Sequence, residues 1–143
     1  MNRLSRLPAL LLIVSLFAGC ATNIRVERPG PTLVGIQHFF VVANSNDNHG
    51  INSQIAAALT ARGLYAETGP LTMMPDETAA IVSYQDHWTW DFGDHLIYLQ
   101  VAMKDRKSGN PLGRSTFSVK FPTRKPTPEI IGELVETLLA PSH

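Results

Sequence analysis

The chemically reactive side chains of this 143-residue chain are concentrated between Tyr84 and His95. This stretch holds both tryptophans of the protein, interleaved with aspartates and histidines. Aspartate and histidine are ordinary ligands of zinc and other transition metals, and they are also common general acids and bases. Two chemistries are therefore considered for the stretch: a metal site built on His87, Asp91 and His95, and acid–base catalysis.

The spacing of these residues argues against a dedicated site. Asp86 and His87 are neighbours on a predicted strand, so their side chains point to opposite faces, and the same holds for Asp94 and His95. Only residues that meet across a hairpin, such as His87 and His95, could converge. The simpler interpretation is a hairpin tip in which the aspartates and Gly93 form the turn. A metal- or small-ligand-binding module that uses the hairpin from Asp86 to His95 stays open as the alternative.

Motifs of known catalytic centres do not occur in the sequence. It contains no Gly-x-Ser-x-Gly motif, no His-Glu-x-x-His motif and no glycine-rich phosphate loop. Asp47 and His49 precede a predicted helix, where a ligand could lie against free backbone amides, but such residues more often only cap the helix. We therefore expect no catalytic residue, no cofactor and no enzymatic activity.

The aromatic residues of the same stretch offer a different function. Trp88, Trp90 and Phe92 exceed what a turn requires, and aromatic side chains are enriched at binding hot spots. Tyr98 follows on the next strand, where we expect it beside Phe39 on a sheet face that no helix covers. Trp88, Trp90, Phe92 and Tyr98 are the candidate partner-binding residues, although at least one tryptophan should pack in the core. A protein, a glycan and a bilayer surface all remain open as partners.

The only cysteine follows an apolar run and has a different role. Residues 16–20 read Leu-Phe-Ala-Gly-Cys and close an apolar stretch over 7–17 that begins after a short basic segment, an arrangement that resembles a bacterial lipobox. The stretch is too short for a transmembrane helix, which needs about 20 apolar residues. We expect cleavage between Gly19 and Cys20, and a covalent S-diacylglycerol and N-acyl lipid, such as palmitate, on Cys20. A plain secretory signal or a buried thiol is the alternative.

The residue after the cysteine indicates which membrane holds the protein. An aspartate there tends to retain a lipoprotein at the inner membrane, whereas this chain has Ala21. We therefore predict an outer-membrane lipoprotein that faces the periplasm. Cleavage would remove two of the 12 basic and none of the 12 acidic residues, which leaves a formal charge of −2. This balance gives no reason to expect nucleic acid as a partner.

Three segments are predicted: a signal peptide over 1–19, a lipidated N-terminus and flexible tether over 20–33, and one globular domain over 34–140. The tether assignment rests on its polar, proline-containing composition. The expected elements, in chain order, are a strand over 34–43, a helix from Ile51 that Gly63 ends, a strand over 64–68, three antiparallel strands over 79–88, 95–104 and 112–121, and a final helix from Thr127.

These elements predict a two-layer α/β (α+β) sandwich. Its mixed sheet has about five strands, and the two helices cover one face in a β-α-β-β-β-β-α order. The first strand is apolar on both sides, so it should lie inside the sheet. Alternation also predicts which side chains share a face. These sets are Ile97, Leu99, Val101 and Met103 on one strand, and Phe117, Val119 and Phe121 on the next.

In this order of elements the chain resembles an uncharacterised family of bacterial lipoproteins. The resemblance covers about residues 34–139 and is carried by Asn46-Asp47-Asn48-His49-Gly50-Ile51, by Ala61-Arg62-Gly63-Leu64 and by the run from Tyr84 to Asp91. The layout is more distantly similar to the amino-terminal domain of the Tol–Pal propeller protein and to periplasmic assembly lipoproteins of exopolysaccharide and curli export. These relatives imply a non-catalytic envelope role as a docking or assembly subunit, with a protein partner or with copies of the chain itself.

Overall fold

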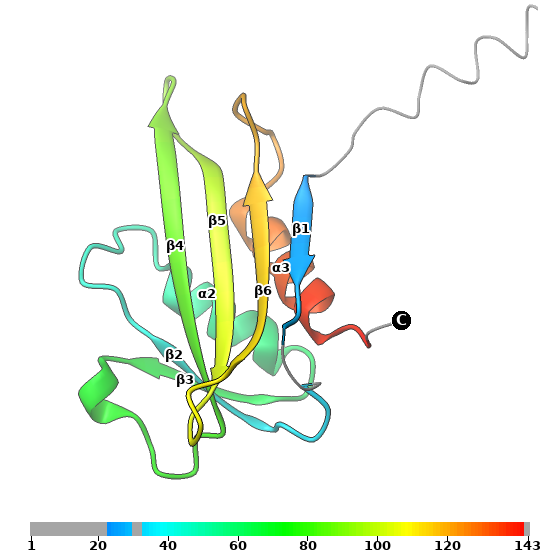
Figure 1. The fold of residues 1–143 in the computed structure, drawn as a ribbon. Coiled ribbons are helices and arrows are strands. Elements are labelled where there is room, and N and C mark those ends of the chain that lie inside the picture. Colours follow the sequence, from blue (N-terminus) through cyan, green and yellow to red (C-terminus); the bar gives the residue numbers. More distant parts are fainter. Residues whose placement is uncertain (1–22, 30–32, 142–143) are drawn as a thin grey trace, which may run out of the picture.

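The computed structural model describes residues 23–29 and 33–141. Over these residues the chain forms six strands and two α-helices, and both helices lie against the same face of the sheet (Figure 1). The elements are β1 (Ile24–Glu27), β2 (His38–Val42), α2 (Ile51–Thr60), β3 (Tyr65–Gly69), the short 3-10 helix η2 (Leu71–Met73), β4 (Ala80–Trp90), β5 (Asp94–Asp105), β6 (Pro111–Ser118) and α3 (Thr127–Leu139).

The sheet is mixed, with the strand order β1-β6-β5-β4-β2-β3. β2 pairs in parallel with both β3 and β4, and α2 connects β2 to β3. From β4 onward the sheet is an antiparallel meander through β5 and β6, and β1 completes its other edge. The predicted α+β class, the mixed sheet and the placement of both helices on one face are confirmed.

The edge strand β1 lies in the segment expected to be a tether. Ile24 pairs with Phe117 and Glu27 with Arg114, so the ordered sheet begins about ten residues before the predicted domain start at 34. The strand is short, but it alternates: Ile24 packs against the core, while Arg25 and Glu27 form an ion pair on the other face. The sequence signal for this strand was weak. Four alternating residues beside a proline-rich stretch form a strand only when the backbone of β6 is available for hydrogen bonding.

Both helices bury the stripes that their periodicity predicts. In α2 these residues are Ile51, Ile55 and Leu59, and in α3 they are Ile130, Ile131, Leu134, Val135 and Leu138, all at most 1 % exposed. The end of α2 is also as predicted: Gly63 has φ 79°, its N–H bonds to the Thr60 carbonyl, and the Leu64 N–H bonds to the Leu59 carbonyl. This pair of bonds is the Schellman ending, and it turns the chain directly into β3.

The first predicted strand is shorter than expected and has its faces reversed. Gly35, with φ 86°, forms a turn, so β2 begins only at His38. Phe39, expected on the open face, is 2 % exposed in the core below the helices, because it is in register with Ala80. Phe40 takes the opposite face. Since both sides of this strand are apolar, alternation alone could not tell which side the helices cover.

Two further register predictions were wrong for local reasons. Between the pairs His87–Tyr98 and Trp88–Leu96 the register shifts, and Ile97 is the extra residue of this β-bulge. Leu96 therefore replaces Ile97 in the buried stripe and is 4 % exposed. β6 ends at Ser118, so Phe121 no longer continues the stripe of Phe117 and is 80 % exposed.

Candidate functional site

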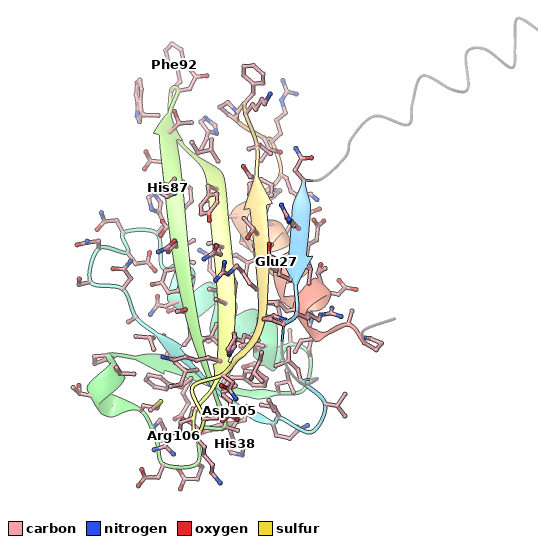
Figure 2. All side chains as sticks on the ribbon, in the orientation of Figure 1. Glu27, His38, His87, Phe92, Asp105 and Arg106 are labelled. Atoms are coloured by element: carbon pink, nitrogen blue, oxygen red, sulfur yellow. The ribbon has the colours of Figure 1, made fainter. Side chains whose placement is uncertain are left out.

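The hairpin that joins β4 to β5 projects from one end of the sheet and carries two of the three most exposed aromatic side chains of the described residues. Trp90 pairs with Asp94, and the residues between them form a loop closed by a bond from the Asp91 N–H to the Gly93 carbonyl. Trp90 is 73 % exposed and Phe92 is 96 % exposed, with 6.1 Å between their ring centroids. Figure 2 places Phe92 at the extreme end of the molecule. We call residues 90–93 the aromatic tip.

Phe92 also has an unusual backbone conformation. Its φ of 51° makes it the only non-glycine residue with positive φ in the part of the chain that the structure describes. Bulky side chains rarely occupy this region, where glycine or asparagine is favoured. Residues held in such a conformation cluster at functional sites, because a fold does not otherwise retain the strain. Neither packing nor the geometry of the turn therefore explains why position 92 is a phenylalanine.

Trp88 plays a structural role, unlike Trp90. Its ring packs against the core and stacks on His49, with 3.7 Å between ring centroids and an interplanar angle of 11°. Its indole N–H donates to Asp86, and His49 Nε2 lies 3.2 Å from Asp94 Oδ2. These contacts fasten the base of the hairpin to the loop before α2. The expectation that one tryptophan packs in the core is met by Trp88.

Asp47 occupies the start of α2, the place where a ligand was considered. Its carboxylate accepts the backbone N–H groups of His49 and Asn52 and the hydroxyl of Tyr84. Burial opposes ionisation of Asp47, but these hydrogen bonds outweigh it and hold the carboxyl pKa below its ordinary value. Burial, reinforced by the nearby Asp47, raises the pKa of Tyr84 to about 12. The arrangement is that of a cap: the helix start is filled by the protein's own side chain.

Tyr98 lies on the sheet face turned away from α2 and α3, which we call the open face. Its ring contacts His87 edge-on, with 5.2 Å between centroids, and its hydroxyl donates to Gln100 Oε1. Figure 2 places His87 on the upper part of β4, below the aromatic tip. The four candidate partner-binding residues therefore lie in three different environments. Trp90 and Phe92 are at the tip, Tyr98 is on the open face, and Trp88 is on the helix side.

The residues of the alternative metal site are not brought together as a ligand set. The strand register pairs His87 with Tyr98 and His95 with Thr89, so the two imidazoles do not face each other. His95 Nε2 instead lies 2.9 Å from the backbone carbonyl oxygen of Asp91. Within residues 23–29 and 33–141 no three His, Cys, Asp or Glu side chains gather closely enough to hold a metal ion.

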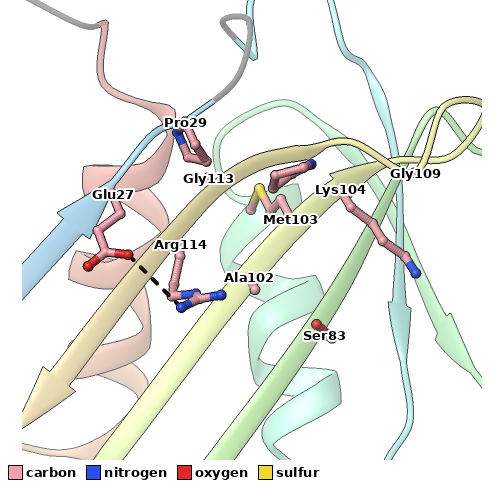
Figure 3. Close-up of a pocket in the computed structure, with 10 residues that line it drawn as sticks. Glu27, Pro29, Ser83, Ala102, Met103, Lys104, Gly109, Gly113 and Arg114 are labelled. Atoms are coloured by element: carbon pink, nitrogen blue, oxygen red, sulfur yellow. Dashed lines mark ion pairs between the residues drawn. The ribbon is translucent and has the colours of Figure 1, made fainter.

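A pocket on the open face near the opposite end offers polar groups but no catalytic pair (Figure 3). It has a volume of ≈ 270 Å³. Its charged residues are Glu27 and Arg114, whose closest side-chain atoms are 4.0 Å apart, and Lys104. The hydroxyl of Ser83 also lines it, but among the described residues no hydrogen bond joins that hydroxyl to Lys104 or to another base. Nothing in the pocket activates a nucleophile.

One exposed aromatic residue was missed in the sequence. Phe121 belongs to the connection over 119–126 between β6 and α3, which turns at the same end of the molecule as the aromatic tip (Figure 1). Lys120 and Arg124 flank it, both exposed and without an ion pair among the described residues. The available signal was Pro122, which directly follows Phe121 and disfavours continuation of an inner strand.

The helices of the described region are all too short or too polar to cross a membrane.

Comparisons with known proteins identify the fold. No protein-family model matches the sequence, and no curated protein matches it. Two dodecamer structures of PelC from Paraburkholderia phytofirmans are similar to this chain. One has a TM-score of 0.60 at 18% identity and covers 82% of this chain and 95% of that chain. The other has a TM-score of 0.59 at 17% identity, with 81% and 93% covered. At these identities the likeness shows a shared fold.

A structure of TolB from Acinetobacter baumannii aligns less well. Its TM-score is 0.48 at 10% identity, covering 82% of this chain and 31% of that chain, which is too low to carry an argument. The distant resemblance of layout predicted from the sequence is thus supported at the level of the fold, through PelC.

Proposed function

We propose that this protein is a non-enzymatic lipoprotein of the bacterial envelope. A lipid on Cys20 holds it on the outer membrane, and its α+β domain acts in the periplasm as an assembly or docking subunit. The lipobox-like residues 16–20 support the anchor. The absence of catalytic motifs in the sequence, and the lack of an activated nucleophile in the described pocket, favour a role in binding over a role in catalysis.

The open face is the observation that carries this proposal. Both helices lie on one side of the sheet, so the other side of β4, β5 and β6 presents side chains to the outside (Figure 1). Its upper part combines the Tyr98–His87 ring pair with the amides of Gln85 and Gln100, which are opposite each other in the register. A surface of aromatic rings and amides suits protein contact better than bulk solvent.

Contact between copies of the chain is the favoured form of assembly. The two PelC structures that share the fold are dodecamers, so this architecture is compatible with a large ring or cluster of copies. In this chain β1 and β3 each have one neighbour within the described part of the sheet, which leaves two strand edges available for further pairing.

The anchor and the assembly require separate experiments. Intact mass spectrometry of protein extracted from membranes with detergent should show loss of residues 1–19 and addition of three acyl chains. Cys20→Ala should abolish both changes. If the wild-type protein keeps its leader or lacks the lipid, the anchored role is wrong.

The open face is tested with a photo-crosslinking amino acid at Gln85, which is exposed on β4. Ser53, which is exposed on α2 away from the sheet, is the matched control position. Illumination of whole envelopes should give a defined crosslinked species from position 85, either a multiple of the subunit mass or a complex with one protein, and none from position 53. A protein that yields no crosslink from position 85 and is monomeric by native mass spectrometry in detergent would refute the assembly role.

A further inference from the structure

Three exposed aromatic side chains gather at one end of the molecule without a core to receive them. Trp90 and Phe92 are on the aromatic tip, and Phe121 is on the connection between β6 and α3, 80 % exposed. Figure 1 shows that the hairpin and this connection turn at the same end, while the other hairpin, with Asp105 and Arg106, lies at the opposite end (Figure 2). These three exposed aromatic side chains therefore all lie at one end of the domain, which we call its pole.

The start of β1 is at the same pole. The carbonyl of Asn23 accepts the N–H of Ser118 at 3.2 Å, and Ser118 pairs with Tyr98. Asn23, Ser118 and Tyr98 therefore lie at one level across the sheet. Beyond that level the β4–β5 hairpin continues for five more residues along β5, from Tyr98 to Gly93. At about 3.3 Å per residue, and allowing for the bulge, the tip projects about 15 Å past Asn23.

The chain that connects the domain to Cys20 is short compared with this projection. Three peptide units separate Cys20 from Asn23, and a fully extended chain spans at most about 3.6 Å per residue, so the connection can reach about 10 Å. The tip projects farther than the tether can reach. Suppose that Cys20 lies at a bilayer surface and that the domain points this pole toward the bilayer. The aromatic tip must then touch the bilayer, because the connection is too short to hold the tip away from the surface.

We infer that this pole is a membrane-contact surface, and that Trp90, Phe92 and Phe121 enter the headgroup region of the bilayer that carries the lipid of Cys20. The inference rests on the anchor proposed above. Tryptophan and other amphipathic aromatic rings favour the membrane–water interface, and exposed aromatic and apolar groups bind there by burying apolar area. Lys120 and Arg124 flank Phe121 and can meet lipid phosphates. The carboxylates of Asp91 and Asp94 would repel anionic lipid. We therefore expect the insertion of aromatic rings to contribute more to membrane binding than charge does.

The backbone of Phe92 supports the same inference independently of its exposure. A phenylalanine with φ 51° at the most distant point of a turn does not help the turn to form. In a bilayer contact the same residue is at the position that penetrates deepest. The strain and the exposure then have one explanation.

The two tryptophans of the chain provide the test. Trp88→Phe leaves Trp90 as the sole reporter of the tip, and Trp90→Phe leaves Trp88, which stacks on His49, as the matched control. Each lipidated protein is extracted in detergent and reconstituted into phosphatidylethanolamine and phosphatidylglycerol vesicles, with or without bromine on the acyl chains. Bromolipid should quench Trp90 fluorescence several-fold and Trp88 fluorescence little, and iodide in the water should quench Trp90 weakly.

Two outcomes would overturn the inference. Trp90 that is insensitive to bromolipid and open to iodide is facing water. Trp90 that is shielded from both quenchers is covered by protein, either by a second copy or by another partner. The mass of the same sample separates this failure from that of the proposed function: a protein that carries its lipid but keeps Trp90 in water refutes only the membrane contact.

A second measurement keeps the test independent of tryptophan replacement. Because Cys20 is the only natural cysteine and its thiol would be acylated, Phe92→Cys can carry a single spin label. Its collision rate with oxygen relative to a water-soluble nickel complex should rise in vesicles. Met73→Cys, on η2 and 71 % exposed, is the control and should keep its solution ratio. Equal ratios at the two positions would contradict the membrane contact.

Discussion

Phe92 has a backbone conformation that is unfavourable for its residue type. A left-handed conformation costs a bulky L-residue about 1 kcal/mol or more, and Phe92 recovers little of that through packing because it is 96 % exposed and its ring neighbour, Trp90, is exposed as well. The neighbouring Gly93 could have been predicted as a turn former, but the positive φ of Phe92 could not. It follows from the length of the loop and the register of β4 and β5, which no local pattern specifies.

Replacing Phe92 by asparagine should therefore stabilise the fold. Asparagine tolerates the left-handed region, so we expect Phe92→Asn to raise the free energy of unfolding by about 0.5–1 kcal/mol in a urea titration. Phe121→Asn serves as the control, because Phe121 is similarly exposed without a positive φ, and its free energy of unfolding should not change. A loss of stability in Phe92→Asn would show that the contact between the rings of Phe92 and Trp90 outweighs the backbone strain.

Asp47 is the residue whose ionisation should matter most for stability. Its folded pKa is lowered, so its contribution is present above the ordinary aspartate pKa of about 3.9 and disappears as the pH falls through the lower folded pKa. We expect Asp47→Asn to unfold more easily by about 1 kcal/mol at neutral pH, since hydrogen bonds to a charged acceptor are the stronger ones.

The difference between wild type and Asp47→Asn should shrink as the pH is lowered below about 4, in urea titrations at a series of pH values. Asp76→Asn is the control, because that side chain is fully exposed and pairs only with Arg106 at the surface. A difference that stays constant across the acid range would mean that the charge of Asp47 does not stabilise the fold.

At the scale of elements, two glycines associated with the helices should respond oppositely to the same substitution. Gly63 ends α2 with φ 79°, where a β-carbon finds open space but a strained backbone. Gly132 lies within α3, where a β-carbon would be 3.9 Å from Arg62 Nη2, an ordinary contact. Gly63→Ala should lower the free energy of unfolding by about 1 kcal/mol, and Gly132→Ala should raise it by about 0.5–1 kcal/mol.

Thermal and urea unfolding of the two variants, measured side by side, check this pair. Equal effects at the two positions would mean that something other than backbone conformation decides. A destabilised Gly132→Ala would indicate that the close approach of Arg62, whose guanidinium donates to the Gly132 carbonyl at 2.7 Å, cannot accommodate a methyl group.

The elements differ in how much of them the sequence reveals. α2 and α3 were predictable because their apolar stripes and the Gly63 ending are local signals. β1 was not, since four residues become a strand only through Phe117 and its neighbours on β6. The bulge at Ile97 was equally hidden, because it appears only when two strands are paired. The same limit applies to the candidate site. The sequence shows which residue types the site contains, but whether Trp88 or Trp90 is exposed depends on the register of β4 and β5.

At the scale of the whole molecule, β1 decides how the domain is oriented. If Cys20 carries the proposed lipid, a flexible tether of about a dozen residues would let the domain turn freely beneath the membrane. With the sheet starting at Ile24, the start of β1, the aromatic tip and the connection between β6 and α3 share one pole, and the open face lies along the side of the domain. In the proposed membrane orientation, neighbouring copies would meet side by side through their open faces and strand edges while each copy keeps its pole on the bilayer.

Lengthening the connection should release this orientation. Insertion of about ten glycine and serine residues after Thr22 adds a flexible chain of roughly 18 Å mean extension, which lowers the effective concentration of the tip at the bilayer. We expect bromolipid quenching of Trp90 to weaken, while the protein stays bound to the vesicles by its lipid. The same insertion between Ser108 and Gly109, at the opposite pole, is the control. Equal quenching in both insertions would mean that tether length does not govern the contact.

The antiparallel ladder between β1 and β6 has a mechanical consequence. The chain enters β1 at the pole of the aromatic tip, so tension between the proposed lipid on Cys20 and the domain would run along the strand rather than across it. The four residue pairs from Ile24–Phe117 to Glu27–Arg114 then share the load together in shear. Had the chain entered β1 from the other pole, the same tension would have peeled these pairs apart one at a time. With the proposed anchor on Cys20, this four-residue edge strand would resist force in the direction from which the membrane pulls.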